Sequence, residues 1–321
     1  MRASTAFIAL LGTFVNARTI SPRSTVSKVF ELDTNPSWLE NLAISENGDI
    51  FATRIDAPEV WKIDPRDGTG LKLAEIPQLT SLTGIAEIRP SEFVVLGLNV
   101  SADSSPVPGS SQAWRLDVHG CSPHLELITT IPEATFVNGA AKANDQTILI
   151  TDSTEGVIYK LDLATNDISI ALSDPETMTI PQNATLPFGV NGIKATKNHV
   201  YYTNTARGYL CRIPIDAQLN ASGPAEIIAS GFVADDFALS SDGTAYIATG
   251  TENTILKVDP KAKVSVAAGS ANSVDIPAAT SVQLGRTPTD RNTLYVTNSG
   301  DQLGPINGTI VLPASVVAVR L

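Results

Sequence analysis

Residues 136–163 decide the fold, and they read FVNGAAKANDQTILITDSTEGVIYKLDL. Three short runs of aliphatic and β-branched residues are separated by turns rich in Asn, Asp and Gly. This composition and spacing predict β-strands rather than helices. The same unit recurs along the chain in copies that begin near residues 38, 81, 188, 233 and 279. The sequence is therefore a sixfold internal repeat.

A fourth strand follows each repeat except the last. These linking strands are expected near residues 71–74, 125–129, 168–172, 226–229 and 264–267. Residues 26–32, VSKVFEL, look like the strand that the last repeat lacks, so an N-terminal strand closes the ring and removes a free sheet edge. We predict an all-β, six-bladed β-propeller with four antiparallel strands per blade. A β-sandwich or two smaller β domains are the alternatives.

The composition narrows the class of protein and its partners. Of the 321 residues, 43% are hydrophobic and 17% are charged, which excludes disorder as the main state. The formal net charge is −11, and an acidic chain repels phosphate backbones, so we expect no nucleic-acid partner. After the N-terminal segment, no stretch is long and apolar enough to span a bilayer. The oligomeric state is left open.

The first residues have the pattern of a secretory signal peptide. Arg2 precedes an apolar run at residues 5–15, and Val15-Asn16-Ala17 provides a cleavage site. We therefore expect residues 1–17 to be a signal peptide and residues 18–321 to form a single propeller domain. The protein is expected in the secretory pathway or outside the cell.

Four N-glycosylation sequons and two cysteines fit the same compartment. The acceptor residues of the sequons are Asn99, Asn183, Asn220 and Asn307. Cys121 and Cys211 can form a disulfide in an oxidising compartment. The repeat places them in non-adjacent blades, so their pairing is left open.

The longest predicted loops fall at one end of the ring. They span residues 97–111, 174–188, 269–279 and 299–314. Long loops gathered on one end of a rigid scaffold predict a covered pocket there, although insertions without function are the alternative. The three histidines, His119, His124 and His199, map to the opposite side, which argues against a Ser-His-Asp triad.

Four polar residues occupy the same register at the start of the innermost strand of their blades. They are Glu40, Asn138, Asn191 and Asp235, and the other two blades have Thr83 and Thr280 there. Two carboxylates and two amide oxygens that meet on an axis form an oxygen-only ligand set, which suits Ca²⁺. A polar channel filled with water is the alternative.

The same four positions resemble the metal-ligand quartet of the gluconolactonase/senescence-marker-protein superfamily, also called regucalcin-like. The resemblance covers nearly the whole chain after residue 17 and implies a six-bladed propeller with one divalent cation, Ca²⁺ preferred, and no organic cofactor. It implies Glu40, Asn138, Asn191 and Asp235 as metal ligands. Asp235 corresponds to the candidate base of lactone hydrolases, and we take Asp235 and Asn191 as candidate catalytic residues.

Three positions depart from that family pattern. Asn41 and Asp236 stand where the family has glycine, and Phe136 stands where sugar-lactone hydrolases have an arginine that grips the substrate. Aromatic walls favour a terpenoid or polyketide surface over a polyol. The expected substrate contacts are Trp38, Thr83, Phe136, Phe188 and Phe237. Packing of these aromatics between blades is the alternative.

The chain looks like a fungal secretory branch of the superfamily that includes hetero-Diels–Alderases of tropolone sesquiterpenoid biosynthesis. The resemblance implies an enzyme of secondary metabolism that acts on a small hydrophobic molecule, by a hetero-Diels–Alder cycloaddition. A divalent-metal-dependent lactonase or esterase is the first alternative. A non-catalytic propeller that binds a ligand is the second.

Overall fold

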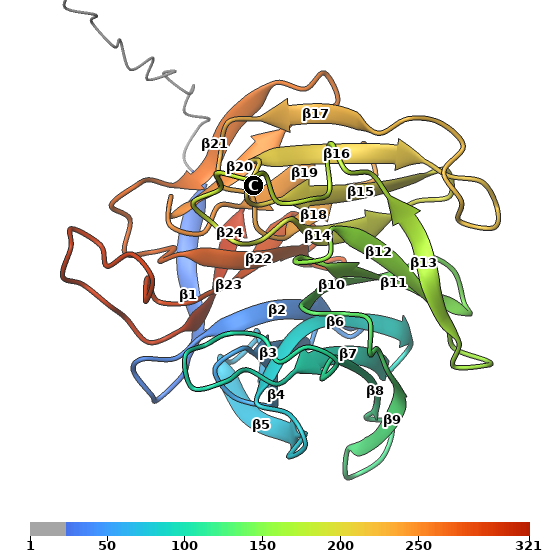
Figure 1. Cartoon of the computed structure of the whole chain (residues 1–321). Coiled ribbons are helices and arrows are strands. Elements are labelled where there is room, and N and C mark those ends of the chain that lie inside the picture. Colours follow the sequence, from blue (N-terminus) through green and yellow to red (C-terminus); the bar gives the residue numbers. More distant parts are fainter. Residues whose placement is uncertain (1–23) are drawn as a thin grey trace, which may run out of the picture.

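The computed structural model describes residues 24–321, which form six four-stranded antiparallel sheets arranged as a ring (Figure 1). Blade one contains β2 (Leu39–Ile44), β3 (Ile50–Arg54), β4 (Glu59–Asp64) and β5 (Thr69–Glu75). Blade two contains β6 (Ser81–Arg89), β7 (Glu92–Leu98), β8 (Gln112–Asp117) and β9 (His124–Thr130). Blade three contains β10 (Val137–Lys142), β11 (Thr147–Asp152), β12 (Val157–Asp162) and β13 (Ile168–Ser173).

The other three blades repeat this order. Blade four contains β14 (Val190–Ala195), β15 (His199–Asn204), β16 (Tyr209–Pro214) and β17 (Glu226–Ser230). Blade five contains β18 (Phe237–Leu239), β19 (Ala245–Ala248), β20 (Thr254–Val258) and β21 (Val264–Gly269). Blade six contains β22 (Ala279–Leu284), β23 (Thr293–Asn298), β24 (Ser315–Arg320) and β1 (Thr25–Glu31). The predicted propeller is confirmed, and the sandwich alternative is excluded.

The ring closes as the sequence predicted. Strand β1 pairs antiparallel with β24, from Thr25 opposite Arg320 to Glu31 opposite Ser315. The N-terminal strand thus becomes the outermost strand of the last blade, and Figure 1 shows it at the rim while the strands that begin each blade surround the centre. The predicted signal peptide, residues 1–17, lies outside the described residues.

The core lies between neighbouring blades rather than within one sheet. Leu149 of blade three packs in one cluster with Val190 and Ile193 of blade four, and similar clusters join other neighbouring blades. Strand β2 is buried along its whole length, because an inner strand is covered on both faces by other blades. Outer strands keep exposed apolar residues such as Leu71 and Ile170. Burial of the inner faces holds the channel walls rigid.

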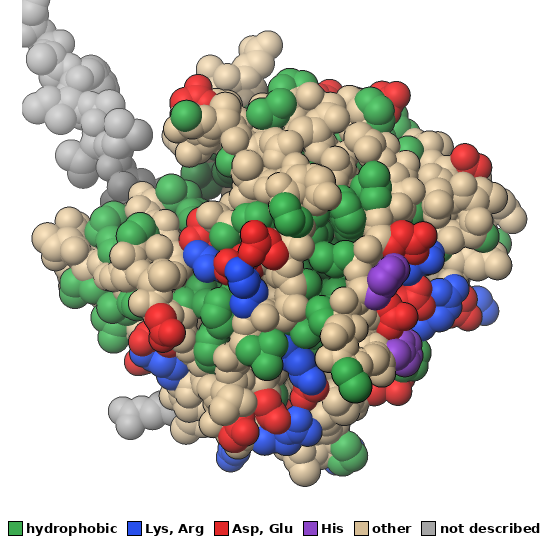
Figure 2. Space-filling model, turned by 90° about the horizontal axis from the view of Figure 1, so that it is seen from below, with side chains coloured by type: hydrophobic (Ala, Val, Ile, Leu, Met, Phe, Trp, Pro, Cys, Tyr) green, Lys and Arg blue, Asp and Glu red, His purple; other side chains and the backbone are tan. Residues whose placement is uncertain are grey.

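The cysteines, the sequon asparagines and the charged side chains can now be placed on the fold. Among residues 24–321, both cysteines are free, with Cys121 exposed and Cys211 buried, so the disulfide left open by the sequence does not form. Three sequon asparagines, Asn183, Asn220 and Asn307, are exposed. On the face in Figure 2, Lys and Arg side chains lie among Asp and Glu side chains. No helix in the described part of the chain is long and apolar enough to cross a membrane.

Candidate active site

A cavity of about 130 Å³ opens at one mouth of the central channel. Its floor contains the start of the inner strands, with Glu40, Asn138, Asn191 and Asp235. Its walls come from loops: Leu186 precedes β14, Ala278 precedes β22, and Ser299 and Leu303 follow β23. Three of the four long loops predicted for this end therefore contribute lining residues.

A β-bulge at the start of the inner strands aims these polar side chains into the channel. The pairing register shifts between Leu39 and Leu42 in blade one, between Val137 and Ala140 in blade three, and between Val190 and Ile193 in blade four. The extra residue in a bulge bends the strand and redirects a side chain. In each of these blades the polar residue lies inside the shifted segment.

The two asparagines on the floor are oriented by hydrogen bonds from their amide nitrogens. Asn138 Nδ2 donates to Ser153 Oγ at 3.2 Å. Asn191 Nδ2 donates to Thr205 Oγ1 and to Asp235 Oδ1, each at 2.9 Å. Asn191 Oδ1 is buried and has no hydrogen-bond partner. An acceptor oxygen is therefore left unsatisfied at the floor, which is a costly state unless a ligand binds it.

Both floor carboxyl groups are poised to hold a proton. Burial raises the pKa of Glu40 to about 7, although the hydrogen bond of 2.6 Å from Trp38 Nε1 opposes this shift. Burial in the channel, together with the charges of Glu40 and Asp236, raises the pKa of Asp235 well above its usual range. Glu40 is buried with 6% of its surface exposed, whereas Asp235 is partly exposed. The floor thus disfavours two negative charges in the absence of a cation.

The residues present fit the calcium ion that the fold family implies. Two carboxylates and two amide groups supply only oxygen ligands, which hard cations prefer. The unsatisfied Oδ1 of Asn191 is the observation that favours a cation over hydrogen bonding within the protein. Within residues 24–321, no group of three or more His, Cys, Asp or Glu side chains is placed to hold a metal. The amide oxygens are therefore essential to any ion bound at this floor.

The walls above the floor are apolar. Trp38, Phe136 and Phe188 line the cavity, and the rings of Phe136 and Phe188 lie 5.4 Å apart. Further lining residues that the sequence analysis missed are Ile55, Leu186, Thr205, Val233 and Leu303. These residues lie in loops and turns, where no periodic sequence pattern shows which way a side chain points.

Two of the expected substrate contacts need correction, because Thr83 and Phe237 lie outside the cavity. Thr83 is fully buried, and its Oγ1 donates to Val137 O of the next blade at 2.9 Å. Phe237 is fully buried in the core cluster of blade five, where it packs near Leu210 and Ile247. Asp235 N donates to Ala248 O and Ala248 N donates to Asp236 O, so two residues oppose one, and this bulge turns the Phe237 side chain away from the channel.

A polar plug crosses the channel directly beneath the floor. Asn41 Nδ2 and Ser281 Oγ both contact Asp236 Oδ2, at 3.0 and 3.2 Å. The residues at the same register in the other blades are Gly84, Gly139 and Gly192. A Cβ added to Gly192 would lie 2.4 Å from Asp236 Oδ1, so glycine is required where the plug approaches. Lys194 Nζ binds the same carboxylate from the far side at 2.8 Å.

The three histidines lie away from this site. His119 follows β8 and contacts Asp117, His124 begins β9, and His199 begins β15. None of the three lines the cavity. The site therefore has no histidine available as a general base.

Two curated fungal proteins are similar to this chain. The protein of Sarocladium schorii named "Putative hetero-Diels-Alderase asR5" is 26% identical, over 93% of this chain and 84% of the relative. The protein of a Phoma species named "Putative hetero-Diels-Alderase" is 24% identical, over 89% of this chain and 88% of the relative. No protein-family model matches the chain.

Solved structures give the same fold. Regucalcin, a calcium-binding protein of Agrobacterium tumefaciens, aligns with a TM-score of 0.62 at 17% identity, over 90% of this chain and 94% of regucalcin. The chain shares the regucalcin-like propeller fold. A "putative gluconolactonase" aligns with a TM-score of 0.63 at 11% identity, over 94% of this chain and 93% of that protein. A luciferin-regenerating enzyme aligns with a TM-score of 0.66 at 15% identity, over 93% of this chain and 96% of the enzyme. The resemblance indicated by the sequence is confirmed.

Proposed function

We propose that this protein is an enzyme of secondary metabolism that catalyses a hetero-Diels–Alder cycloaddition on a hydrophobic natural-product intermediate. The proposal is supported by the two curated relatives, which are similar over most of their length. The observation that carries it is the pairing of apolar walls with a polar, proton-holding floor in one cavity. The proposed location is the secretory pathway, with glycans on the exposed sequons.

The walls meet the first requirement of such a reaction, which is to hold two apolar partners in one orientation. Phe136, Phe188 and Trp38 provide broad apolar surfaces, and burying such surface contributes about 25 cal/mol per Å². Correct placement of two reactants contributes up to about 7–11 kcal/mol in favourable cases. The cycloaddition forms one C–C and one C–O bond and releases no group, so the enzyme needs no nucleophile or strong base.

The floor meets the second requirement, which is to stabilise charge that develops on the oxygen of the diene. Glu40 and Asp235, with raised pKa values, can present a carboxyl O–H to that oxygen, and such aimed donors stabilise a transition state. A divalent cation, if bound, would supply Lewis-acid polarisation at the same place. Glu40, Asn138, Asn191 and Asp235 would hold it.

The cavity volume constrains how substrate enters. About 130 Å³ is smaller than the 300–1,000 Å³ typical of sites that enclose small molecules. Two joined ring systems therefore require the loop of residues 299–314 to move outward. Leu303 of that loop lines the cavity and has 70% of its surface exposed, so it loses little packing when the loop moves.

The second candidate is a divalent-metal-dependent lactonase or esterase. The unsatisfied Oδ1 of Asn191 among two carboxylates favours it, because a bound cation would polarise an ester carbonyl at that point. Phe136 argues against a sugar lactone, because the wall offers no hydrogen bond to a polyol at that position.

The deciding experiment supplies an o-quinone methide generated in situ and a sesquiterpene alkene. We expect the protein to give one stereoisomer of the adduct faster than the background reaction, and to leave gluconolactone intact. The control is the Phe136→Arg variant, which keeps the floor but places a charge in the wall. Efficient gluconolactone hydrolysis that chelation abolishes, with adduct formation at the background rate, would establish the second candidate instead.

A further inference from the structure

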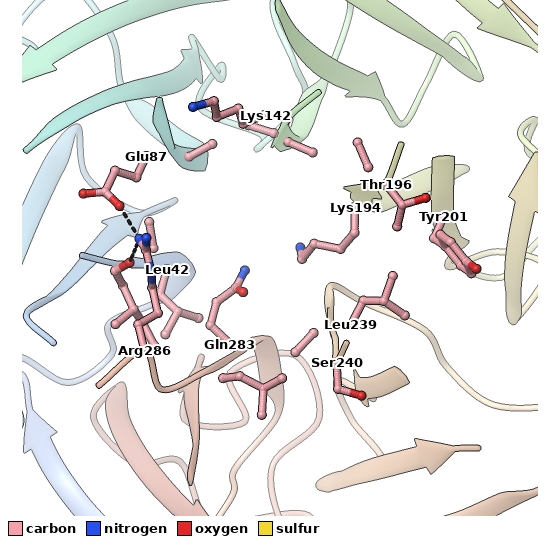
Figure 3. A pocket seen from close by; sticks show the side chains of 18 of the residues that line it. Leu42, Glu87, Lys142, Lys194, Thr196, Tyr201, Leu239, Ser240, Gln283 and Arg286 are labelled. Atoms are coloured by element: carbon pink, nitrogen blue, oxygen red, sulfur yellow. Dashed lines mark hydrogen bonds and ion pairs between the residues drawn. The ribbon is translucent and has the colours of Figure 1, made fainter. Parts of the chain in front are cut away.

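The far end of the channel contains a second and larger cavity, of about 670 Å³. It is lined by the last residues of the inner strands, from Leu42–Ile44 of blade one to Gln283 and Leu284 of blade six. Figure 3 shows this cavity surrounded by side chains from all sides of the ring. The volume lies within the range of small-molecule sites.

The plug separates this far-mouth cavity from the candidate active site. Asn41, Asp236 and Ser281 are buried and hydrogen-bonded to one another between the consecutive blades five, six and one. No residue lines both cavities. The two mouths can therefore hold different ligands at the same time.

The walls of the far-mouth cavity combine polar and apolar surface in similar amounts. One register of the inner strands has alanine in four blades, and these small side chains leave the channel wide. They are Ala43, Ala86, Ala141 and Ala238. Larger apolar side chains surround them, and these are Leu42, Ile44, Ile85, Leu239 and Leu284. The cavity thus offers an apolar surface to a ligand body.

Blade four places a cation at the register where most blades have alanine. Lys194 Nζ binds Asp236 Oδ1 at 2.8 Å and lies 5.1 Å from the ring centroid of Phe237. An ammonium has three donors, and only the bond to Asp236 is found for it in the described structure. The Lys194 side chain is 17% exposed, and Figure 3 shows it reaching toward the open middle of the cavity.

The charged side chains that line the cavity are mostly basic in an otherwise acidic protein, and each basic group is paired with a carboxylate. Lys142, Lys194 and Arg286 line the cavity, with Glu87 as the carboxylate among the lining residues. Arg286 pairs with Glu87 and with Glu46, and it also donates to Ile44 O. Lys142 and Lys194 are each paired with one carboxylate, and each ammonium keeps further N–H donors for a ligand.

The partner of Lys142 leaves that ammonium available. Lys142 Nζ contacts Asp145 Oδ1 at 2.8 Å, and the Asp145 side chain is 92% exposed. An exposed pair of this kind contributes little free energy, about 0–1 kcal/mol, so a ligand can replace it. Gln283 adds an amide that can both donate and accept, and it also points into the cavity in Figure 3.

We propose that the far-mouth cavity is a binding site for a small amphipathic anion, a carboxylate with an aliphatic or aromatic body. The carboxylate lies at Lys194, which points into the middle of the cavity and forms charge-assisted hydrogen bonds, and Lys142 adds positive charge at the edge. The apolar body lies against the alanine register and the surrounding Leu and Ile side chains. This site is distinct from the candidate active site and goes beyond the proposed cycloaddition.

Isothermal titration calorimetry with sodium octanoate tests the site on the full chain. We expect 1:1 binding that weakens as sodium chloride is raised, because salt screens the ammonium groups. Octan-1-ol and octylammonium have the same apolar body without the negative charge. Both are expected to bind about tenfold more weakly, or not at all.

Variants locate the bound octanoate. Lys142→Glu reverses the charge at the rim, and Ala86→Phe fills the apolar wall, so each is expected to weaken binding about tenfold. Lys263→Gln is the matched control, because Lys263 is an exposed lysine that does not line the cavity. Circular dichroism and thermal unfolding of each variant establish that it is folded.

Two outcomes overturn the proposal. One is equal affinity for octanoate and octylammonium, which shows that charge is not recognised. The other is weaker octanoate binding in Phe136→Ala with no change in Lys142→Glu and Ala86→Phe, which places octanoate in the opposite mouth. Neither outcome bears on adduct formation, so failure here leaves the proposed cycloaddition standing.

Discussion

Asn41 Nδ2 of blade one donates to Asp236 Oδ2 of blade five at 3.0 Å. These two residues are the positions at which the chain departs from the glycines of the regucalcin-like pattern, and they lie 195 residues apart in sequence. The departures therefore form one feature. Together with Ser281 and Lys194 they form one buried polar cluster beneath the floor.

We predict that removing the plug carboxylate destabilises the fold. Asp236→Ala leaves Lys194 without its partner and is expected to lower the free energy of unfolding by about 3 kcal/mol. Asn41→Ala is expected to cost about 1–2 kcal/mol, because it removes a buried hydrogen bond. Urea unfolding of the two single variants and the double variant measures their coupling.

Asp145→Asn is the control for that series, because it removes an exposed charge pair with Lys142. We expect a change below about 1 kcal/mol. Strict additivity of Asn41→Ala and Asp236→Ala would show that the two residues do not act together.

We expect the free energy of unfolding to depend on pH because of the protonation of Glu40. Burial raises its folded-state pKa to about 7 from the ordinary value of 4.5, so the folded state holds a proton that the unfolded chain releases. The proton held by Glu40 makes its full contribution to the free energy of unfolding below about pH 4.5, and this contribution is lost as the pH rises to about 7. Its upper limit is about 3 kcal/mol. Thermal unfolding from pH 4 to 8, with Glu40→Gln as the comparison, measures it, and identical profiles would refute the assignment.

Calcium is expected to bind the floor and raise the unfolding temperature. At a hundredfold excess over the dissociation constant, one site contributes about 2.7 kcal/mol. Differential scanning calorimetry with CaCl₂ and with EDTA measures the effect, and Asn191→Ala should abolish it. The exposed Asn198→Ala is the matched control. An equal calcium effect in both variants would place the ion elsewhere.

We expect the aromatic wall to determine how fast the adduct forms. Phe136→Arg puts a guanidinium beside Phe188, and we expect at least about tenfold slower adduct formation, because apolar contact is lost and a charge is brought into the wall. Phe136→Leu keeps an apolar side chain and should lose far less. Product analysis by chiral chromatography measures both rate and stereochemistry. Equal rates in the two variants would remove Phe136 from the substrate contacts.

The sequence alone was enough to predict the ring, its closure by residues 26–32 and the convergence of the floor quartet. These predictions succeeded because a repeat with a fixed register fixes the direction of equivalent side chains. Phe237 was misplaced because one irregular residue in a strand reverses the face of those that follow. Leu186 and Leu303 were missed because they lie in loops, where the direction of a side chain depends on how the loop packs against several blades.

The pairing of β1 with β24 also sets the order of biogenesis. The two halves of this seam leave the ribosome at opposite ends of synthesis, so the first strand must wait for the last before either gains its partner. Until then both present unpaired backbone groups, the kind of edge that invites association between chains. Closure of the ring therefore requires β1 and β24, the first and last described strands, to meet.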